Sequence, residues 1–218
     1  VLSSDVDNQR KGSYEIVYEA FDEVGNRSEL ARTVDYQLVE APFDFEYVLK
    51  FKTDWPLSGD DRSAQVGLCQ SIDFNGDAID GTEAFFGVFN GRGFEFSNFE
   101  ISDSDDSLFD SIASDAEVRN LYIRGARVSG RNNLGVLASQ NDGLIDKVQI
   151  SDSFIEENSS NRARRAGALV AVNQGVISLS SSIGNSIQSD SEVGGLVGRN
   201  TGLIENSFSL LNQVEGDE

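Results

Sequence analysis

The sequence contains no histidine among its 218 residues. A Ser-His-Asp or Cys-His triad needs an imidazole base, and a His-Glu-x-x-His zinc site needs two imidazole ligands. The chain therefore excludes both kinds of hydrolytic site within its own residues.

Methionine is absent as well, and cysteine is almost as scarce. Cys69 is the single cysteine, so the chain forms no intrachain disulfide and no cysteine-rich zinc site. Because Cys69 lies in an apolar segment, it is expected to be a small buried side chain. The chain has no methionine, not even at its first residue. We expect it to be an internal piece of a longer protein.

Basic residues are few. Seventeen lysines and arginines stand against 37 acidic residues, which leaves a formal charge of −20. Nucleic acids and anionic membrane surfaces attract basic proteins, so neither is an expected partner. No run reaches the roughly 18 apolar residues of a membrane span, so we expect no membrane insertion. The hydrophobic share of 39%, with 14 phenylalanines, still supplies a core.

Helical periodicity is also absent, and a repeat takes its place. Three stretches beginning at Leu134, Ala166 and Val193 follow one pattern, with offsets of 32 and 27 residues. A period in this range is typical of a solenoid in which each repeat is one coil. The shared positions are Gly135, Gly167 and Gly194; Leu137, Leu169 and Leu196; Asn141, Asn173 and Asn200; Gly143, Gly175 and Gly202; and Ile145, Ile177 and Ile204.

Short apolar runs bounded by Gly, Asn, Ser and Asp extend the repeat toward the N-terminus. Related strands start at residues 96, 118, 145, 177 and 204, with steps of 22, 27, 32 and 27 residues, which predicts about five coils. Coils made of short strands stack in parallel. The fold class is therefore all-β, a right-handed parallel β-helix, with the hand taken from the usual crossover chirality.

The repeated residues have expected structural roles. The Leu and Ile columns point inward, and each coil buries them only by stacking on the next coil. The Asn-x-Gly turns are expected to bend the chain at positive φ, and their stacked amides to bond along the axis. A second, partial column of Asn98, Asn120 and Asn206 is interrupted by Lys147 and Leu179.

The N-terminal region follows a different pattern. Alternating residues from Tyr14 to Phe21 and from Thr33 to Val39 predict a hairpin around a Gly25-Asn26 turn. The string from Gly12 to Asn26 resembles the closing hairpin of bacterial immunoglobulin-like surface modules. We expect residues 1–40 to be the last strands of such a module, 41–65 a linker and entry strand, and 66–218 the β-helix.

The segment from Val193 to Ser207, VGGLVGRNTGLIENS, resembles the GLUG motif of bacterial surface proteins. That motif occurs in filamentous adhesins and in the β-helical parts of immunoglobulin A1-cleaving metallopeptidases. The resemblance implies a non-enzymatic, extracellular, cell-surface segment that serves as an adhesin, stalk or filament. Its implied partners are a glycan or protein on a host or neighbouring cell surface, or further copies of itself.

A carbohydrate-binding or polysaccharide-acting β-helix is the alternative, because such proteins use exterior carboxylates. The candidates lie in two acidic loops and on the next coil: Asp73, Asp77, Asp80 and Glu83; Asp103, Asp105, Asp106 and Asp110; and Arg119, Arg124 and Arg127. Such charges are more often solvated loop residues, so we expect no enzyme and no catalytic residue.

Two further groups are candidates for binding. Oxygen-bearing side chains alternate at Asp73, Asn75 and Asp77 and cluster at Asp103, Asp105 and Asp106, which makes them weak calcium ligands, although neither completes an EF-hand loop. We otherwise expect no cofactor. The insert at residues 156–167 carries Arg162, Arg164 and Arg165, a basic cluster suited to an anionic partner.

Overall fold

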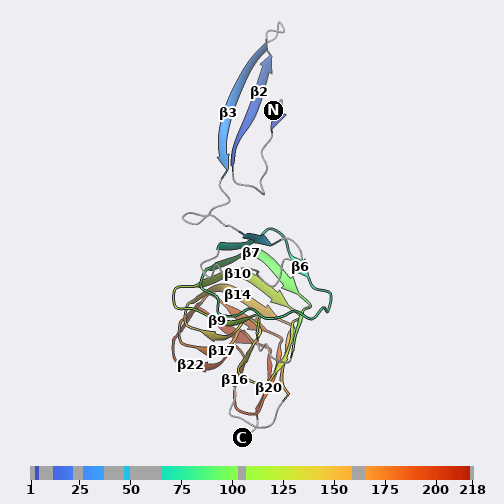
Figure 1. Cartoon of the computed structure of the whole chain (residues 1–218), viewed down its shortest axis with the longest axis vertical. Coiled ribbons are helices and arrows are strands. Elements are labelled where there is room, and N and C mark those ends of the chain that lie inside the picture. Colours follow the sequence, from blue (N-terminus) through green and yellow to red (C-terminus); the bar gives the residue numbers. More distant parts are fainter. Residues whose placement is uncertain are drawn as a thin grey trace. The chain divides into compact units, whose positions relative to one another are not determined.

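The computed structural model describes strand backbone within residues 3–4, 12–21, 27–36 and 47–49, and describes residues 65–102, 107–158 and 165–216 in full. The chain divides into two compact units, Val1–Phe45 and Glu46–Glu218 (Figure 1). The described residues contain strands and no helix, which confirms the all-β class.

The first unit contains one antiparallel sheet in the order β1-β2-β3. It consists of β1 (Ser3–Ser4), β2 (Gly12–Phe21) and β3 (Arg27–Tyr36). Strands β2 and β3 pair along their whole length, from Gly12 with Tyr36 to Phe21 with Arg27. The expected hairpin is present, although its returning strand begins at Arg27 and not at Thr33. Its likeness to an immunoglobulin-like module stays a prediction.

The second unit is a parallel β-solenoid, in which each coil contributes strands to successive sheets. Because the solenoid strands pair in parallel with their counterparts one coil away, the predicted stacking is confirmed. The first sheet begins with β4 (Tyr47–Leu49), β5 (Gln65–Leu68), β6 (Ile72–Asp73), β7 (Val88–Ser97) and β10 (Glu117–Arg124). It continues with β14 (Leu144–Ser151), β18 (Val176–Ser178), β19 (Ser181–Ile183), β23 (Leu203–Glu205) and β24 (Phe208–Leu210).

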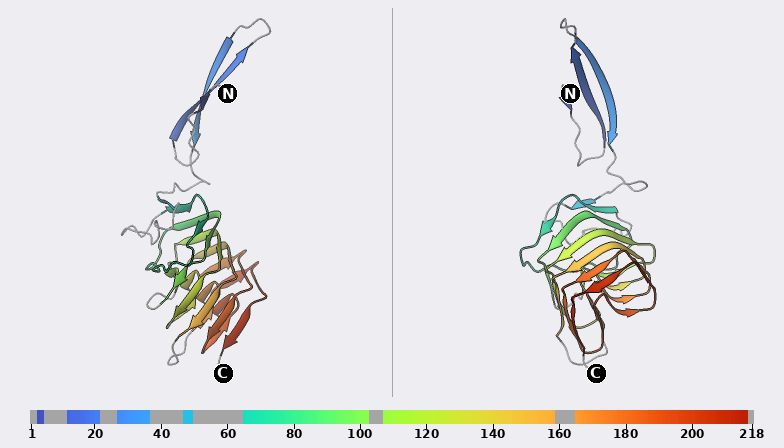
Figure 2. Two further views of the ribbon diagram at one scale, coloured as in Figure 1. Left: turned by 90° about the vertical axis from the view of Figure 1, so that its right-hand side faces the viewer. Right: turned by 180° about the vertical axis from the view of Figure 1, so that it is seen from behind.

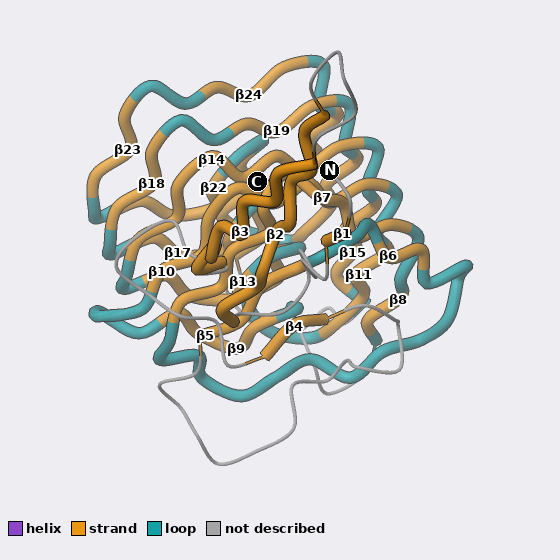
Figure 3. The backbone as a smooth tube through the Cα atoms, turned by 90° about the horizontal axis from the view of Figure 1, so that it is seen from above, coloured by secondary structure: helices purple, strands orange, loops and turns teal. Residues whose placement is uncertain are grey.

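Three smaller sheets complete the coils. The second sheet contains β8 (Glu100–Ile101), β11 (Arg127–Gly130), β15 (Phe154–Glu157), β20 (Ser186–Ser189) and β25 (Gln213–Gly216). The third contains β12 (Leu134–Gly135), β16 (Arg165–Gly167) and β21 (Glu192–Gly194). The fourth contains β9 (Phe109–Ile112), β13 (Ala138–Asn141), β17 (Val170–Asn173) and β22 (Val197–Asn200). Together they form about five coils, stacked in sequence order (Figures 2 and 3).

The register confirms three of the four predicted steps and corrects the first. Ile145 pairs with Val118 and Ile177, and Ile177 pairs with Ile204, which gives the steps of 27, 32 and 27. The expected step of 22 from Phe96 to Val118 is wrong, because Phe96 pairs with Ile123. The segments that start at Phe96 and Val118 look alike because each crosses a left-handed bend, but the two bends are different corners of the coil.

The interior changes in character along the solenoid. Five phenylalanines of the early coils have no exposed surface and pack mainly edge to face: Phe74, Phe89, Phe96, Phe99 and Phe109. In the later coils, the inward column that starts at Phe99 continues as Ala126, Ser153, Asn185 and Asn212. The Asn185 amide donates to Asn212 Oδ1 at 3.0 Å and to Ser182 Oγ at 2.9 Å. Buried polar groups require such partners. The last coils therefore have a hydrogen-bonded interior that the apolar pattern did not predict.

The predicted asparagine ladder is present. Asn141 and Asn173 have no exposed surface, and Asn141 Nδ2 donates to Asn173 Oδ1 at 2.7 Å. Asn173 Nδ2 donates to Asn200 Oδ1 at the same distance. The side chains of one column thus bond coil to coil along the axis.

The glycines of the Asn-x-Gly turns have a different role from the expected one. None of Gly143, Gly175 and Gly202 has a positive φ. A Cβ atom on Gly175 would instead lie 2.2 Å from the Gly143 carbonyl oxygen, and one on Gly202 would lie 2.2 Å from that of Gly175. The expectation of left-handed backbone was wrong here, because close stacking of the turns is what requires glycine.

Left-handed backbone occurs in two other columns, which we call the first and second bends. The first bend, within the first sheet, contains Asn120, Lys147, Leu179 and Asn206, with φ values of 51°, 53°, 49° and 50°. The second bend, between the first and second sheets, contains Asn98, Gly125, Asp152, Gly184 and Leu211. Asn98 therefore does not belong to the column of Asn120, and the expected second asparagine column is a column of backbone conformation.

Candidate functional site: a groove at the second bend

The second bend lies beside a cavity of about 300 Å³, which we call the second-bend groove. Its lining includes the buried Phe99 and Ala126 and the more exposed Glu100, Arg127 and Phe154. Consecutive coils bring these residues together, because Glu100, Arg127 and Phe154 hold equivalent register positions on β8, β11 and β15.

Glycine alternates with polar residues along this bend and leaves room between them. Gly125 lies between Asn98 and Asp152 and has φ +67°, a conformation that L side chains rarely adopt. A Cβ atom on Gly125 would also lie 2.6 Å from Asn98 Oδ1. On the other side of Asp152, a Cβ atom on Gly184 would lie 3.2 Å from Asp152 Oδ1. The absence of side chains at Gly125 and Gly184 therefore leaves space for the side chains of Asn98 and Asp152.

The Asp73 carboxylate fixes the turn next to the groove. Its Oδ1 accepts hydrogen bonds from the Asn75 backbone N–H at 2.8 Å and from Asn98 Nδ2 at 3.0 Å. The Asp77 carbonyl accepts a bond from the Glu100 N–H at 3.0 Å. These candidate calcium ligands thus take part in turn and coil contacts. Within the described ranges, no three acidic, His or Cys side chains form a group that could hold a metal ion.

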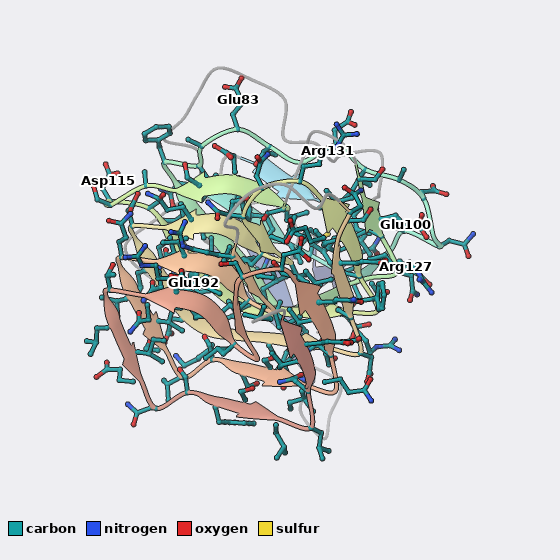
Figure 4. The ribbon with its side chains drawn as sticks, turned by 90° about the horizontal axis from the view of Figure 1, so that it is seen from below. Glu83, Glu100, Asp115, Arg127, Arg131 and Glu192 are labelled. Carbon is teal, nitrogen blue, oxygen red and sulfur yellow. The ribbon has the colours of Figure 1, made fainter. Side chains whose placement is uncertain are left out.

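Ion pairs join outward side chains of neighbouring coils. Arg127 Nε lies 3.8 Å from Glu100 Oε1, and Figure 4 shows both residues at the same edge of the solenoid. Arg124 donates to both carboxylate oxygens of Glu95, from Nε at 3.3 Å and from Nη2 at 3.1 Å. The hydrogen bond and the negative charge of Glu95 raise the pKa of Arg124, and the more distant charges of Asp152 and Asp73 raise it further.

The structure places the other candidate residues as follows. Asp77, Asp80 and Glu83 are exposed outside the strands, and Asp110, expected in a loop, is exposed on β9. The basic residue Arg165 opens β16, and its Nε donates to Glu192 Oε2 on the next coil at 2.6 Å. Five candidates lie outside the described residues: Asp103, Asp105, Asp106, Arg162 and Arg164. Cys69, expected to be buried, is half-buried directly after β5.

Of the residues that line the groove, sequence reasoning named Arg127 as a candidate but missed most of the others. It placed Asn98 in the wrong column and did not consider Asp152 or Phe154. A step of 27 residues between Asn98 and Gly125 would have revealed the second bend, because it also aligns Phe96 with Ile123. The shared Asn of the two similar strands favoured the shorter step instead.

No protein-family model, curated protein or solved structure matches this chain. Among the described residues, no helix is long and apolar enough to cross a membrane. The arrangement at the groove can bind a ligand through an aromatic ring, an amide, a guanidinium group and two carboxylates.

Proposed function

We propose that this chain is a non-enzymatic segment of an extracellular, cell-surface protein, and that it serves in an adhesin or stalk. The proposal depends on one observation: the residues that recur in every repeat make contacts between coils. The Asn column bonds coil to coil, and the glycine columns permit the close stacking of the turns. The residues that recur are therefore devoted to assembling a stack of coils.

The outward charges support the same role. Arg127 pairs with Glu100, and Arg165 pairs with Glu192, in each case between residues in register on adjacent coils. An exposed ion pair contributes little stability alone, at about 0–1 kcal/mol. Repeated along a stack, such pairs favour the correct register. The remaining outward residues differ from coil to coil, so a partner surface would contact side chains that the repeat does not specify.

Surface labelling of the source cells tests this proposal. Antibodies raised against the full chain are applied to intact cells and to permeabilised cells, with an antibody to a cytosolic protein as the control. We expect the full signal on intact cells, where the control antibody gives none. A signal that requires permeabilisation would contradict the proposal.

A further inference from the structure

We propose that the second-bend groove binds a neutral sugar residue of a glycan. This inference rests on the proposed surface function and names the class of ligand that the surface segment would contact. The cavity of about 300 Å³ is at the lower end of the range for small-molecule sites. It therefore suits a short stretch of a glycan better than a folded protein partner.

The groove combines the two kinds of contact that a sugar ring offers. A pyranose has an apolar face and a rim of hydroxyl groups that both donate and accept hydrogen bonds. Phe154 supplies an aromatic ring, half-buried at the start of β15. The Glu100 and Asp152 carboxylates accept hydrogen bonds, the Arg127 guanidinium donates them, and the Asn98 amide does both.

Two of these groups, the Asp152 carboxylate and the Phe154 ring, lie on one coil and are not repeated on the coils beside it. In the register column of Phe154, the flanking coils carry Arg127 and Ser186, so Phe154 contributes the aromatic ring. In the second bend, Asp152 lies between Gly125 and Gly184, neither of which has a side chain. The structural repeat therefore does not require Phe154 or Asp152, because neighbouring coils carry other residues in their places.

The charge around the groove selects a neutral sugar. Two carboxylates, Glu100 and Asp152, outnumber the one guanidinium of Arg127, which lies 3.8 Å from Glu100. The whole chain carries a formal charge of −20. Like charges repel and slow the approach of an anionic ligand. Sialylated and uronic acid-rich glycans are therefore disfavoured.

Copying residues from neighbouring coils gives variants that keep the backbone. Phe154→Ser introduces serine, the residue that pairs in register with Phe154 on the next coil, at Ser186. Asp152→Gly introduces glycine, the residue at the same bend position on the two flanking coils, at Gly125 and Gly184. Phe208→Ser is the matched control, because it removes a half-exposed phenylalanine from β24 and copies Ser181. Circular dichroism and urea unfolding of each full-length variant check that the fold is retained.

The test uses an array of neutral, sialylated and uronic acid-containing oligosaccharides, followed by calorimetric titration with the neutral oligosaccharide that gives the strongest signal. We expect the full chain to bind neutral glycans. Phe154→Ser and Asp152→Gly should each weaken binding about tenfold, a loss of about 1.4 kcal/mol. Phe208→Ser should bind as the unchanged chain does.

Three results would overturn the inference: no binding of any neutral glycan, a preference for acidic glycans, or equal affinity of the Phe154→Ser variant and the unchanged chain. If intact cells are labelled but no neutral glycan binds, the groove inference fails and the surface function stands. If labelling requires permeabilisation, the surface function fails whatever the array shows.

Discussion

The side-chain amide of Asn141 donates a hydrogen bond to the amide oxygen of Asn173 across 2.7 Å, although the two residues are 32 positions apart. The bond lies in the fully buried interior, and Asn173 makes the equivalent bond to Asn200, 27 positions further on. One column of asparagines thus spans steps of different length. The five extra residues of the 32-residue step therefore do not displace the asparagines from their column.

Breaking the ladder at its centre should destabilise the solenoid. Asn173→Ala removes one ladder bond on each side, and the buried Asn141 Nδ2 then keeps only its longer contacts with the Gly143 and Val176 carbonyl oxygens, at 3.3 and 3.4 Å. We therefore expect the free energy of unfolding to fall by about 3 kcal/mol. Asn200→Ala affects the exposed last member of the same ladder and should cost about 1 kcal/mol. Urea unfolding of both variants checks the order, and an equal loss in the two would contradict it.

Replacing Leu179 by asparagine should stabilise the chain. Leu179 has φ 49° and is 53% exposed, whereas Asn120 and Asn206 hold the same bend position in other coils. Asparagine tolerates left-handed backbone better than leucine, so we expect Leu179→Asn to gain about 0.5–1 kcal/mol. Leu179→Val should instead lose stability, since β-branched residues fit this conformation poorly. A lower urea midpoint for Leu179→Asn than for the unchanged chain would refute the strain argument.

Two glycines should respond differently to alanine. A Cβ atom on Gly167 would lie 2.2 Å from the Val170 carbonyl oxygen and 2.6 Å from the Gly198 nitrogen, so the coils would have to separate. We expect Gly167→Ala to cost about 3 kcal/mol or more. Gly93 has φ +80° but nothing within 4 Å of the added Cβ, so Gly93→Ala should cost only about 1–2 kcal/mol. Thermal unfolding of both variants measures the difference in stability. A larger loss of stability for Gly93→Ala would contradict this expectation, because backbone conformation would then matter more than the close contacts at Gly167.

A charge at a buried repeat position should prevent stable folding. Leu169 has no exposed surface, so Leu169→Asp combines loss of a core side chain with burial of a carboxylate. We expect a loss of about 4 kcal/mol or more in the free energy of unfolding. The matched control is Leu203→Asp, where 51% of the leucine is exposed, and it should change stability by less than about 1 kcal/mol. Similar urea midpoints for the two variants would contradict the assigned inward and outward faces.

The sequence predicted the stacked architecture because inward leucine and isoleucine columns must recur once per coil. It predicted the asparagine ladder for the same reason, since equivalent polar residues stack at one turn. The second bend was not predicted, because left-handed backbone is shared by residues as different as Asn98, Gly125 and Asp152. The groove lies at this bend. Its residues could not be aligned in the sequence by residue type, because the bend position holds a different type of residue in successive coils. The polar interior around Asn185 was missed because hydrogen bonding, and not hydrophobicity, keeps that residue buried.

Nuclear magnetic resonance of the side-chain amides of Asn141 and Asn173 tests most directly whether the repeated residues serve the stack. We predict slow exchange of the Asn141 amide protons with water and a nuclear Overhauser contact between the two side chains, as the 2.7 Å bond requires. Rapid exchange without any such contact would show that the repeated asparagines face solvent, and would contradict their assignment to coil stacking.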